Sequence, residues 1–221
     1  MKIFHLSPLV CAFCRSNVCY EEFPVCCDCL PHFQASLNSL CKKCGRNALR
    51  CECSERNSVK FLFYYDHPYA KRLVYSVKTN MDERITDFFV EMLFRYNGIN
   101  PNKYDGIAFV PRSRAGKSRY GHDQALELAK AVRRVYGIEV VDAIERIGKR
   151  EQKLLSRSQR IKDIKDKYRL KNGTGKKYKR LLLIDDVYTT GATMKVCSEL
   201  LRGTVAENVS PIVLAKTNFP K

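Results

Sequence analysis

The chain has 221 residues, 45% of them hydrophobic, which is typical of a globular protein with one substantial domain and a small addition. No run approaches the roughly 20 apolar residues of a membrane span, and the first ten residues are too short and interrupted for a secretion signal. We therefore expect a cytoplasmic protein. The net charge of +17 favours polyanionic partners such as nucleic acid, anionic lipid or a pyrophosphate substrate.

The beginning of the chain is rich in cysteine. Ten of the eleven cysteines precede residue 54, and eight of them form close pairs: Cys11 and Cys14, Cys26 and Cys29, Cys41 and Cys44, Cys51 and Cys53. Two thiolates at such spacing converge on one tetrahedral ion, so eight ligands suffice for two structural zinc sites. A disulfide framework is not expected without an export signal. In ~50 residues with little core, zinc would contribute much of the folding free energy.

The pairing of these ligands stays open. The first two pairs could share one ion and the last two the other, or the first pair could combine with the third. The shorter spacing of Cys51 and Cys53 makes them the weakest ligand pair, so the segment holds one or two zinc ions. Cys19 and Cys27 are spare, although Cys27 could replace Cys26. Redox-active pairs are the competing interpretation, but four pairs in one segment favour zinc.

The rest of the chain alternates strand and helix patterns after a polar linker at 54–58. This alternation is typical of a parallel α/β sheet flanked by helices. We expect a zinc-binding module over residues 1–56 and an α/β domain over 57–221. The expected strands are 59–65, 107–110, 138–143, 181–184 and 212–215, and the expected helices begin near residues 68, 85, 125 and 194.

An acidic pair follows the most apolar of these strands. The four aliphatic residues Leu181–Ile184 predict a buried strand that stops at Asp185 and Asp186. A loop of small and hydroxyl residues leads from there into a helical pattern. Backbone N–H groups and the helix dipole at such a loop attract an anion, and paired carboxylates can hold the vicinal hydroxyls of a sugar. A ribose 5-phosphate would fit both halves.

This arrangement resembles the 5-phosphoribosyl-1-pyrophosphate (PRPP) motif of type I phosphoribosyltransferases. The resemblance implies that Asp185 and Asp186 hold the ribose hydroxyls of a magnesium-bound PRPP. It further implies that the 5-phosphate is wrapped by Thr189, Thr190, Gly191, Ala192 and Thr193. Tyr188 stands where the motif usually has an aliphatic residue. The alternative is an acidic strand cap followed by an ordinary surface turn.

A basic loop follows the strand at 107–110. Its residues, 111–119, include four basic side chains and no acidic one. The loop lies where type I phosphoribosyltransferases carry their pyrophosphate loop. Arg112, Ser113 and Arg114 could therefore reach pyrophosphate oxygens through charge-assisted hydrogen bonds. A solvated basic loop is the alternative.

The order of cysteine pairs, linker, basic loop and Asp-Asp-Val-Tyr-Thr-Thr-Gly-Ala-Thr segment resembles the ComF/ComFC competence family over nearly the whole chain. Further family-like residues are Lys78, Gly121, Gln124, Gln152 and Arg160, whereas Tyr120, His122 and Asp123 depart from the usual Arg-Gly-Phe-Asn-Gln. The resemblance implies a phosphoribosyltransferase-like fold. It also implies a cytoplasmic role in natural transformation, on incoming single-stranded DNA and alongside DNA-uptake or recombination proteins.

The excess positive charge is concentrated in residues 145–180, which hold 15 basic and 4 acidic residues. We expect this block to bind single-stranded DNA through Arg157, Arg160, Lys162 and Lys165, with electrostatics dominating because it contains few aromatic side chains. A solvated face is the bland alternative. Two other functions remain open: a true phosphoribosyltransferase acting on a small acceptor, and a zinc-containing interaction protein whose fold binds nothing.

Overall fold

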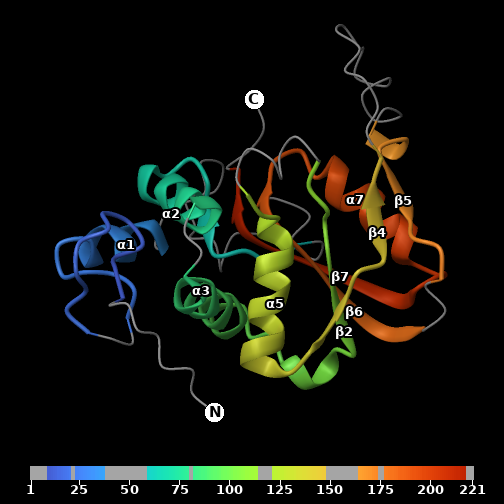
Figure 1. The fold of residues 1–221 in the computed structure, drawn as a ribbon, viewed down its shortest axis with the longest axis horizontal. Helices are drawn as coiled ribbons and strands as arrows, with labels where there is room; N and C mark the ends of the chain where they lie inside the picture. Colours follow the sequence, from blue (N-terminus) through green and yellow to red (C-terminus); the bar gives the residue numbers. More distant parts are fainter. Residues whose placement is uncertain are drawn as a thin grey trace, which may run out of the picture.

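The computed structural model describes residues 9–20, 23–37, 59–79, 82–113, 121–147, 164–173 and 177–217 (Figure 1). The helices are α1 (Leu30–Leu37), α2 (Pro68–Thr79), α3 (Glu83–Tyr96), α5 (Gln124–Tyr136) and α7 (Ala192–Leu201). The strands are β1 (Phe63–Tyr64), β2 (Gly106–Phe109), β3 (Glu139–Val141), β4 (Ile144–Arg146), β5 (Tyr168–Leu170), β6 (Tyr178–Tyr188) and β7 (Ala206–Lys216). None of the described helices is long and apolar enough to cross a membrane.

Five strands form one parallel sheet in the order β1-β7-β6-β2-β3. Leu181–Ile184 of the central strand β6 are fully buried, because apolar layers cover both faces of the sheet. One layer contains side chains of α2, α3 and α5, and the other contains those of α7 and the β4–β5 pair. The expected fold, a parallel α/β sheet flanked by helices and preceded by a cysteine-rich segment, is confirmed.

The cysteine-rich segment packs onto the sheet domain through aromatic rings. Phe33 of α1 is 2% exposed, and its ring centroid lies 6.1 Å from that of Phe63 and 6.4 Å from that of Phe89. Phe23 contacts Phe88 edge-to-face at 4.9 Å. Figure 1 shows this segment beside α2 and α3. The two regions therefore share one continuous apolar core.

Several expected boundaries were wrong. β6 does not stop at Asp185 but continues to Tyr188, because β7 keeps pairing with it out to Lys216. The expected strand at 138–143 ends at Val141, and the chain then enters the unpredicted antiparallel pair β4–β5. These short strands lie near the two ends of the basic block. Helix α1 was also not predicted.

Candidate functional site

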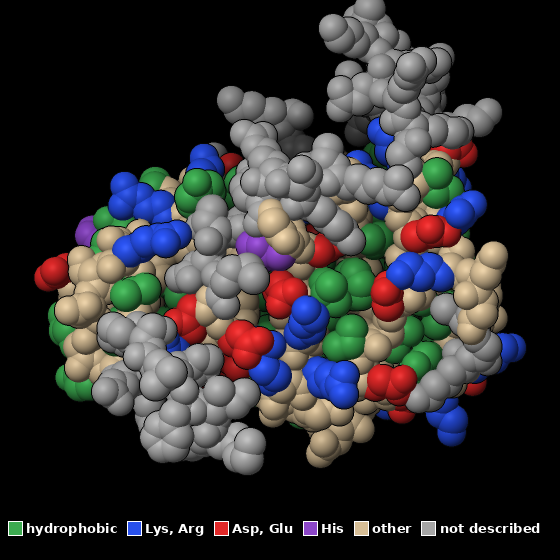
Figure 2. Space-filling view, in the orientation of Figure 1, with side chains coloured by type: hydrophobic (Ala, Val, Ile, Leu, Met, Phe, Trp, Pro, Cys, Tyr) green, Lys and Arg blue, Asp and Glu red, His purple; other side chains and the backbone are tan. Residues whose placement is uncertain are grey.

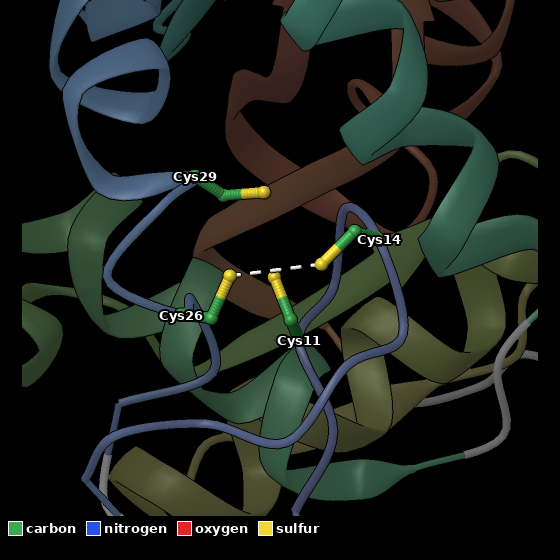
Figure 3. Close-up of side chains that lie close together, drawn as sticks. All are labelled: Cys11, Cys14, Cys26 and Cys29. Carbon is green, nitrogen blue, oxygen red and sulfur yellow. Dashed lines mark hydrogen bonds between the residues drawn. The ribbon is translucent and has the colours of Figure 1, made fainter.

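Four cysteine side chains converge in two tight turns near the N-terminus (Figure 3). The Arg15 N–H donates to the Cys11 carbonyl at 2.9 Å, and the Cys29 N–H donates to the Cys26 carbonyl at 3.1 Å. These turns direct the sulfur atoms of Cys11, Cys14, Cys26 and Cys29 to within 4.8 Å of one another. The Cys14 and Cys26 sulfurs are 3.6 Å apart.

This arrangement fits a tetrahedral zinc site. Zinc–sulfur bonds of about 2.3 Å place sulfurs about 3.8 Å apart, close to the observed separation. A hydrogen bond with the Ser16 side chain lowers the pKa of Cys14 to about 6, whereas burial raises the pKa of Cys26 and Cys29. A divalent cation would offset the cost of burying thiolates, so the donor set suits a structural metal.

The geometry answers part of the pairing question. The first two cysteine pairs come together, as sequential use requires. Cys27 is bonded to Cys19 in a disulfide, so neither is a spare thiol and Cys27 does not replace Cys26. No disulfide was expected here, and spacing alone gave no signal for it. The remaining predicted ligands, Cys41, Cys44, Cys51 and Cys53, lie outside the described residues.

The acidic pair and the described start of the basic loop, Arg112 and Ser113, lie on neighbouring strands or directly after them. β2 and β6 are neighbours in register, with Phe109, the last residue of β2, opposite Ile184. Arg112 therefore follows the end of β2, and Asp185 lies in the adjacent strand β6 one residue beyond that pairing. Asp185 and Asp186 are half-buried, and the Asp185 carboxylate accepts the Asp186 N–H at 2.8 Å. Ligands of parallel α/β sheets bind beyond this carboxyl edge. Arg114 lies outside the described residues.

The loop after β6 leads directly into a helix N-terminus. Thr189 and Thr190 are exposed, and Gly191 is the N-cap of α7 with a φ of 77°, a left-handed conformation that favours glycine. The Thr190 hydroxyl accepts the Ala192 N–H at 3.4 Å. Ala192 and Thr193 form the first turn of α7. The loop therefore presents hydroxyl and N–H groups at the positive end of a helix dipole.

Tyr188, where the chain departs from the PRPP motif, packs against this loop. Its hydroxyl contacts Gly191 so closely that a Cβ there would clash with the ring, whose Cε2 would lie 2.9 Å away. The ammonium of Lys216 lies 5.2 Å above the same ring. Gly191 is thus required both for its φ and for the room that Tyr188 occupies.

Asp123 is a site residue that sequence reasoning missed. It is 4% exposed, and its carboxylate accepts the Arg112 N–H at 2.9 Å. This contact attaches the basic loop to the start of α5. Its neighbour Gln124 is 2% exposed, and the side-chain nitrogen of Gln124 has no hydrogen-bond partner among the described residues. An Asp at the N-cap position of a predicted helix was the feature of the sequence that could have identified it.

The β4–β5 pair lies beside the acidic edge. Tyr168 is buried, and burial raises its pKa to about 12 while the nearby Arg146 guanidinium, 5.5 Å above the ring, acts in the opposite direction. The side chain of Thr193 in α7 acts on the Tyr168 pKa in the same direction as Arg146. Cys197 is buried, which raises its pKa. No pattern in the sequence predicted these two short strands.

Most of the predicted DNA contacts cannot be placed. Arg157, Arg160 and Lys162 lie outside the described residues, and Lys165 is exposed with its ammonium 3.7 Å from the Glu199 carboxylate. On the face drawn in Figure 2, described Lys and Arg side chains are interspersed with Asp and Glu. The described part of that face therefore presents no large patch of one sign.

No protein-family profile and no curated protein matches the chain. A solved structure of the allosteric regulatory enzyme of purine biosynthesis is similar to it, with 18% sequence identity and a TM-score of 0.40. The similarity covers 58% of this chain but 25% of that enzyme, so the chain corresponds to about a quarter of the enzyme's length. The strand order and cysteine cluster themselves define the class: a parallel α/β protein with a candidate four-cysteine metal centre.

Proposed function

We propose that the chain binds PRPP with magnesium at the carboxyl edge of its sheet. The observation that carries this proposal is the order of three features: the carboxylates of Asp185 and Asp186, the left-handed Gly191, and the N-terminus of α7. Carboxylates suit sugar hydroxyls, and N–H groups at a helix N-terminus suit a phosphate. The oxygen donors of the ligand and of this edge are those that magnesium prefers.

Each group at the edge has a distinct part in this proposal. The carboxylates hold the ribose hydroxyls, residues Thr189–Thr193 hold the 5-phosphate, and Arg112 with Ser113 and Arg114 neutralises the pyrophosphate. If the ribosyl group is transferred, the anomeric carbon gains positive charge as pyrophosphate leaves. Positioning of the sugar and stabilisation of the leaving group would then supply the rate enhancement.

Calorimetry with PRPP and magnesium tests the site. Asp186→Ala removes a sugar-binding carboxylate and is expected to weaken binding at least roughly tenfold, since charged hydrogen bonds contribute about 1.5–3 kcal/mol. Glu207→Ala removes an exposed carboxylate at the other end of the sheet, in β7, and should bind PRPP like the wild type. Equal affinity of the Asp186→Ala variant and the wild type would refute the assignment.

The biological role we propose is that of a ComF-like factor in natural transformation. The protein would bind incoming single-stranded DNA in the cytoplasm, with DNA-uptake or recombination proteins as partners. The net charge of the block at 145–180 supports DNA binding, because Lys and Arg contacts release counterions. Log affinity is then expected to fall by ~0.7 per log unit of salt for each phosphate contacted.

Replacing Arg157, Arg160, Lys162 and Lys165 with Ala should weaken DNA binding and flatten its salt dependence. Asp186→Ala removes no cation and should leave DNA affinity nearly unchanged. Filter binding or fluorescence anisotropy at several salt concentrations measures both effects. DNA affinity of the quadruple variant equal to that of the wild type would make the block a solvated face.

The alternative is an active phosphoribosyltransferase on a small acceptor. Purine-salvage enzymes resembling this motif have an Asp at the position of Thr189, which assists proton transfer at the base. Thr189 cannot do so near neutral pH. An assay of pyrophosphate release from PRPP, with and without single-stranded DNA, separates the two functions: turnover without DNA favours the transferase.

A further inference from the structure

A groove with a volume of about 720 Å³ runs along α7 behind the phosphate loop. Neither Asp185 nor Asp186 lines it, so it is separate from the acidic pair, although it shares Thr190–Ala192 with the proposed 5-phosphate site. One wall is α7, and the other is formed by β7 and the residues before β1. Its apolar floor contains the half-buried side chains of Tyr104, Tyr188 and Pro211, together with Val59 and Val209, which are buried in the same apolar layer as α7. Pockets for small molecules have volumes of about 300–1,000 Å³.

Positive charge lines this groove. Lys60, Lys165, Lys195 and Arg202 lie around it with one carboxylate, Glu199, which pairs with Lys165 at 3.7 Å. Lys195 on α7 and Arg202, the C-cap residue directly after α7, are exposed and form no ion pair within the part of the chain that the structure describes. They are two helical turns apart, on one side of the helix. The groove therefore combines an apolar floor with unneutralised cations.

Lys60 adds a further positive charge on the opposite wall of the groove. Its ammonium donates a hydrogen bond to the Asn97 carbonyl at 3.1 Å. Partial burial, and then repulsion from Lys103, lowers the pKa of Lys60. An anion in the groove would relieve the repulsion and favour the charged ammonium.

Two tyrosines define what else the groove would accept. Tyr104 and Tyr188 both line it, and each is half-buried, so part of each side chain remains accessible. Tyrosine rings and aliphatic side chains on a sheet form a favourable environment for a planar aromatic group. Tyr188 also contacts Gly191, so a molecule in the groove would lie against the back of the phosphate loop.

We propose that this groove is a second binding site, for a phosphorylated aromatic molecule of about nucleotide size. The phosphate binds between Lys195 and Arg202, and the aromatic ring lies against the half-buried lining side chains of Tyr104, Tyr188 and Pro211. The cations match the phosphate of such a molecule, and the apolar floor matches its aromatic ring. The two features together therefore favour a phosphorylated aromatic ligand. The site goes beyond PRPP binding and does not depend on it.

Binding of 1-naphthyl phosphate to the full chain tests the site, because this probe has no ribose hydroxyls for the acidic pair. Calorimetry should show saturable binding that inorganic phosphate or 1-naphthol alone matches only weakly. Lys195→Gln/Arg202→Gln is expected to weaken binding roughly tenfold or more. The matched control, Lys71→Gln/Arg133→Gln, removes an exposed Lys and an exposed Arg from α2 and α5 and should bind like the wild type.

A second variant tests whether binding depends on the shape of the groove and not only on its charge. Ser210→Phe fills the groove from β7 and should abolish probe binding without removing a charge. Asp186→Ala should bind the probe like the wild type, even if PRPP binding proves absent from both. The proposal is overturned if the wild type does not bind the probe, if either groove variant binds it normally, or if Asp186→Ala loses it.

Discussion

The cysteine cluster and the acidic edge of the sheet achieve their geometry by different means. The cluster consists of two short turns, with few buried side chains of its own beyond Phe33 and its neighbours. The acidic edge is held by β6, which pairs with a strand on each side and is buried on both faces. A loss of metal should therefore unfold the cluster locally, whereas the acidic edge should tolerate it.

The largest expected difference between the cluster and the acidic edge follows from removing a zinc ligand. Structural zinc in small modules binds with about 10–16 kcal/mol of apparent free energy. Cys26→Ser should remove one zinc per chain and raise hydrogen exchange over 23–37, while amides of β6 stay protected. Elemental analysis and hydrogen exchange measure both effects.

Cys27→Ser is the control, because Cys27 is the adjacent residue and lies in the disulfide with Cys19 rather than in the cluster. This variant should keep the zinc content of the wild type. Equal zinc content in the two variants would show that Cys26 is not a ligand.

Phe33→Ala tests the apolar contact between the two regions. Its ring packs among the rings of Phe13, Phe23, Phe63, Phe88 and Phe89, so truncation leaves a cavity. Urea denaturation should show a loss of about 3–5 kcal/mol in the free energy of unfolding, with zinc retained. Gln34→Ala, at an exposed neighbouring position, should change it little. A loss below about 1 kcal/mol for Phe33→Ala would mean that the regions do not share a core.

Gly191→Ala tests the acidic edge from within. Gly191 and Gly203 have the same φ of 77°, but a Cβ at Gly203 meets nothing within 4 Å, whereas at Gly191 it meets Tyr188. Both alanine variants should lose about 1–3 kcal/mol through backbone strain. Only Gly191→Ala should lose more and fail to bind PRPP, as measured by denaturation and calorimetry. Equal losses would mean that the Tyr188 contact costs nothing to displace.

The smallest expected effect is a pH dependence at the junction of the two regions. Burial, and then the charge of His32, lowers the pKa of His67 below its usual 6.5, and the buried Nδ1 of His67 has no hydrogen-bond partner in the part of the chain that the structure describes. The unfolded chain therefore binds more protons than the folded one just below pH 6.5. Stability should be fully present above that pH and fall as the pH decreases toward the folded pKa.

His67→Gln should flatten this decline when unfolding is followed between pH 7.5 and 5. Zinc content is measured at each pH, because thiolate protonation releases metal independently. An unchanged slope in the variant would assign the pH dependence to other groups.

Sequence reasoning succeeded where the determinants are local. The pairs Cys11/Cys14 and Cys26/Cys29 are close in the chain, so their spacing was enough to predict convergence on an ion. The run Leu181–Ile184 was enough to predict a buried strand, and the small residues after it were enough to predict a turn into a helix. Each of these signals lies within a few residues of the structure that it specifies.

Only the tertiary structure decided the features that join distant segments. Spacing could not show that Cys27 pairs with Cys19, or that Asp123 accepts the N–H of Arg112 across a loop. Nor could it show that β6 extends past Asp185, since that length depends on pairing with β7. Local sequence specifies ligand types and short turns through covalent geometry. The partners of a side chain depend on packing between elements far apart in the chain, which the periodicity of one segment does not contain.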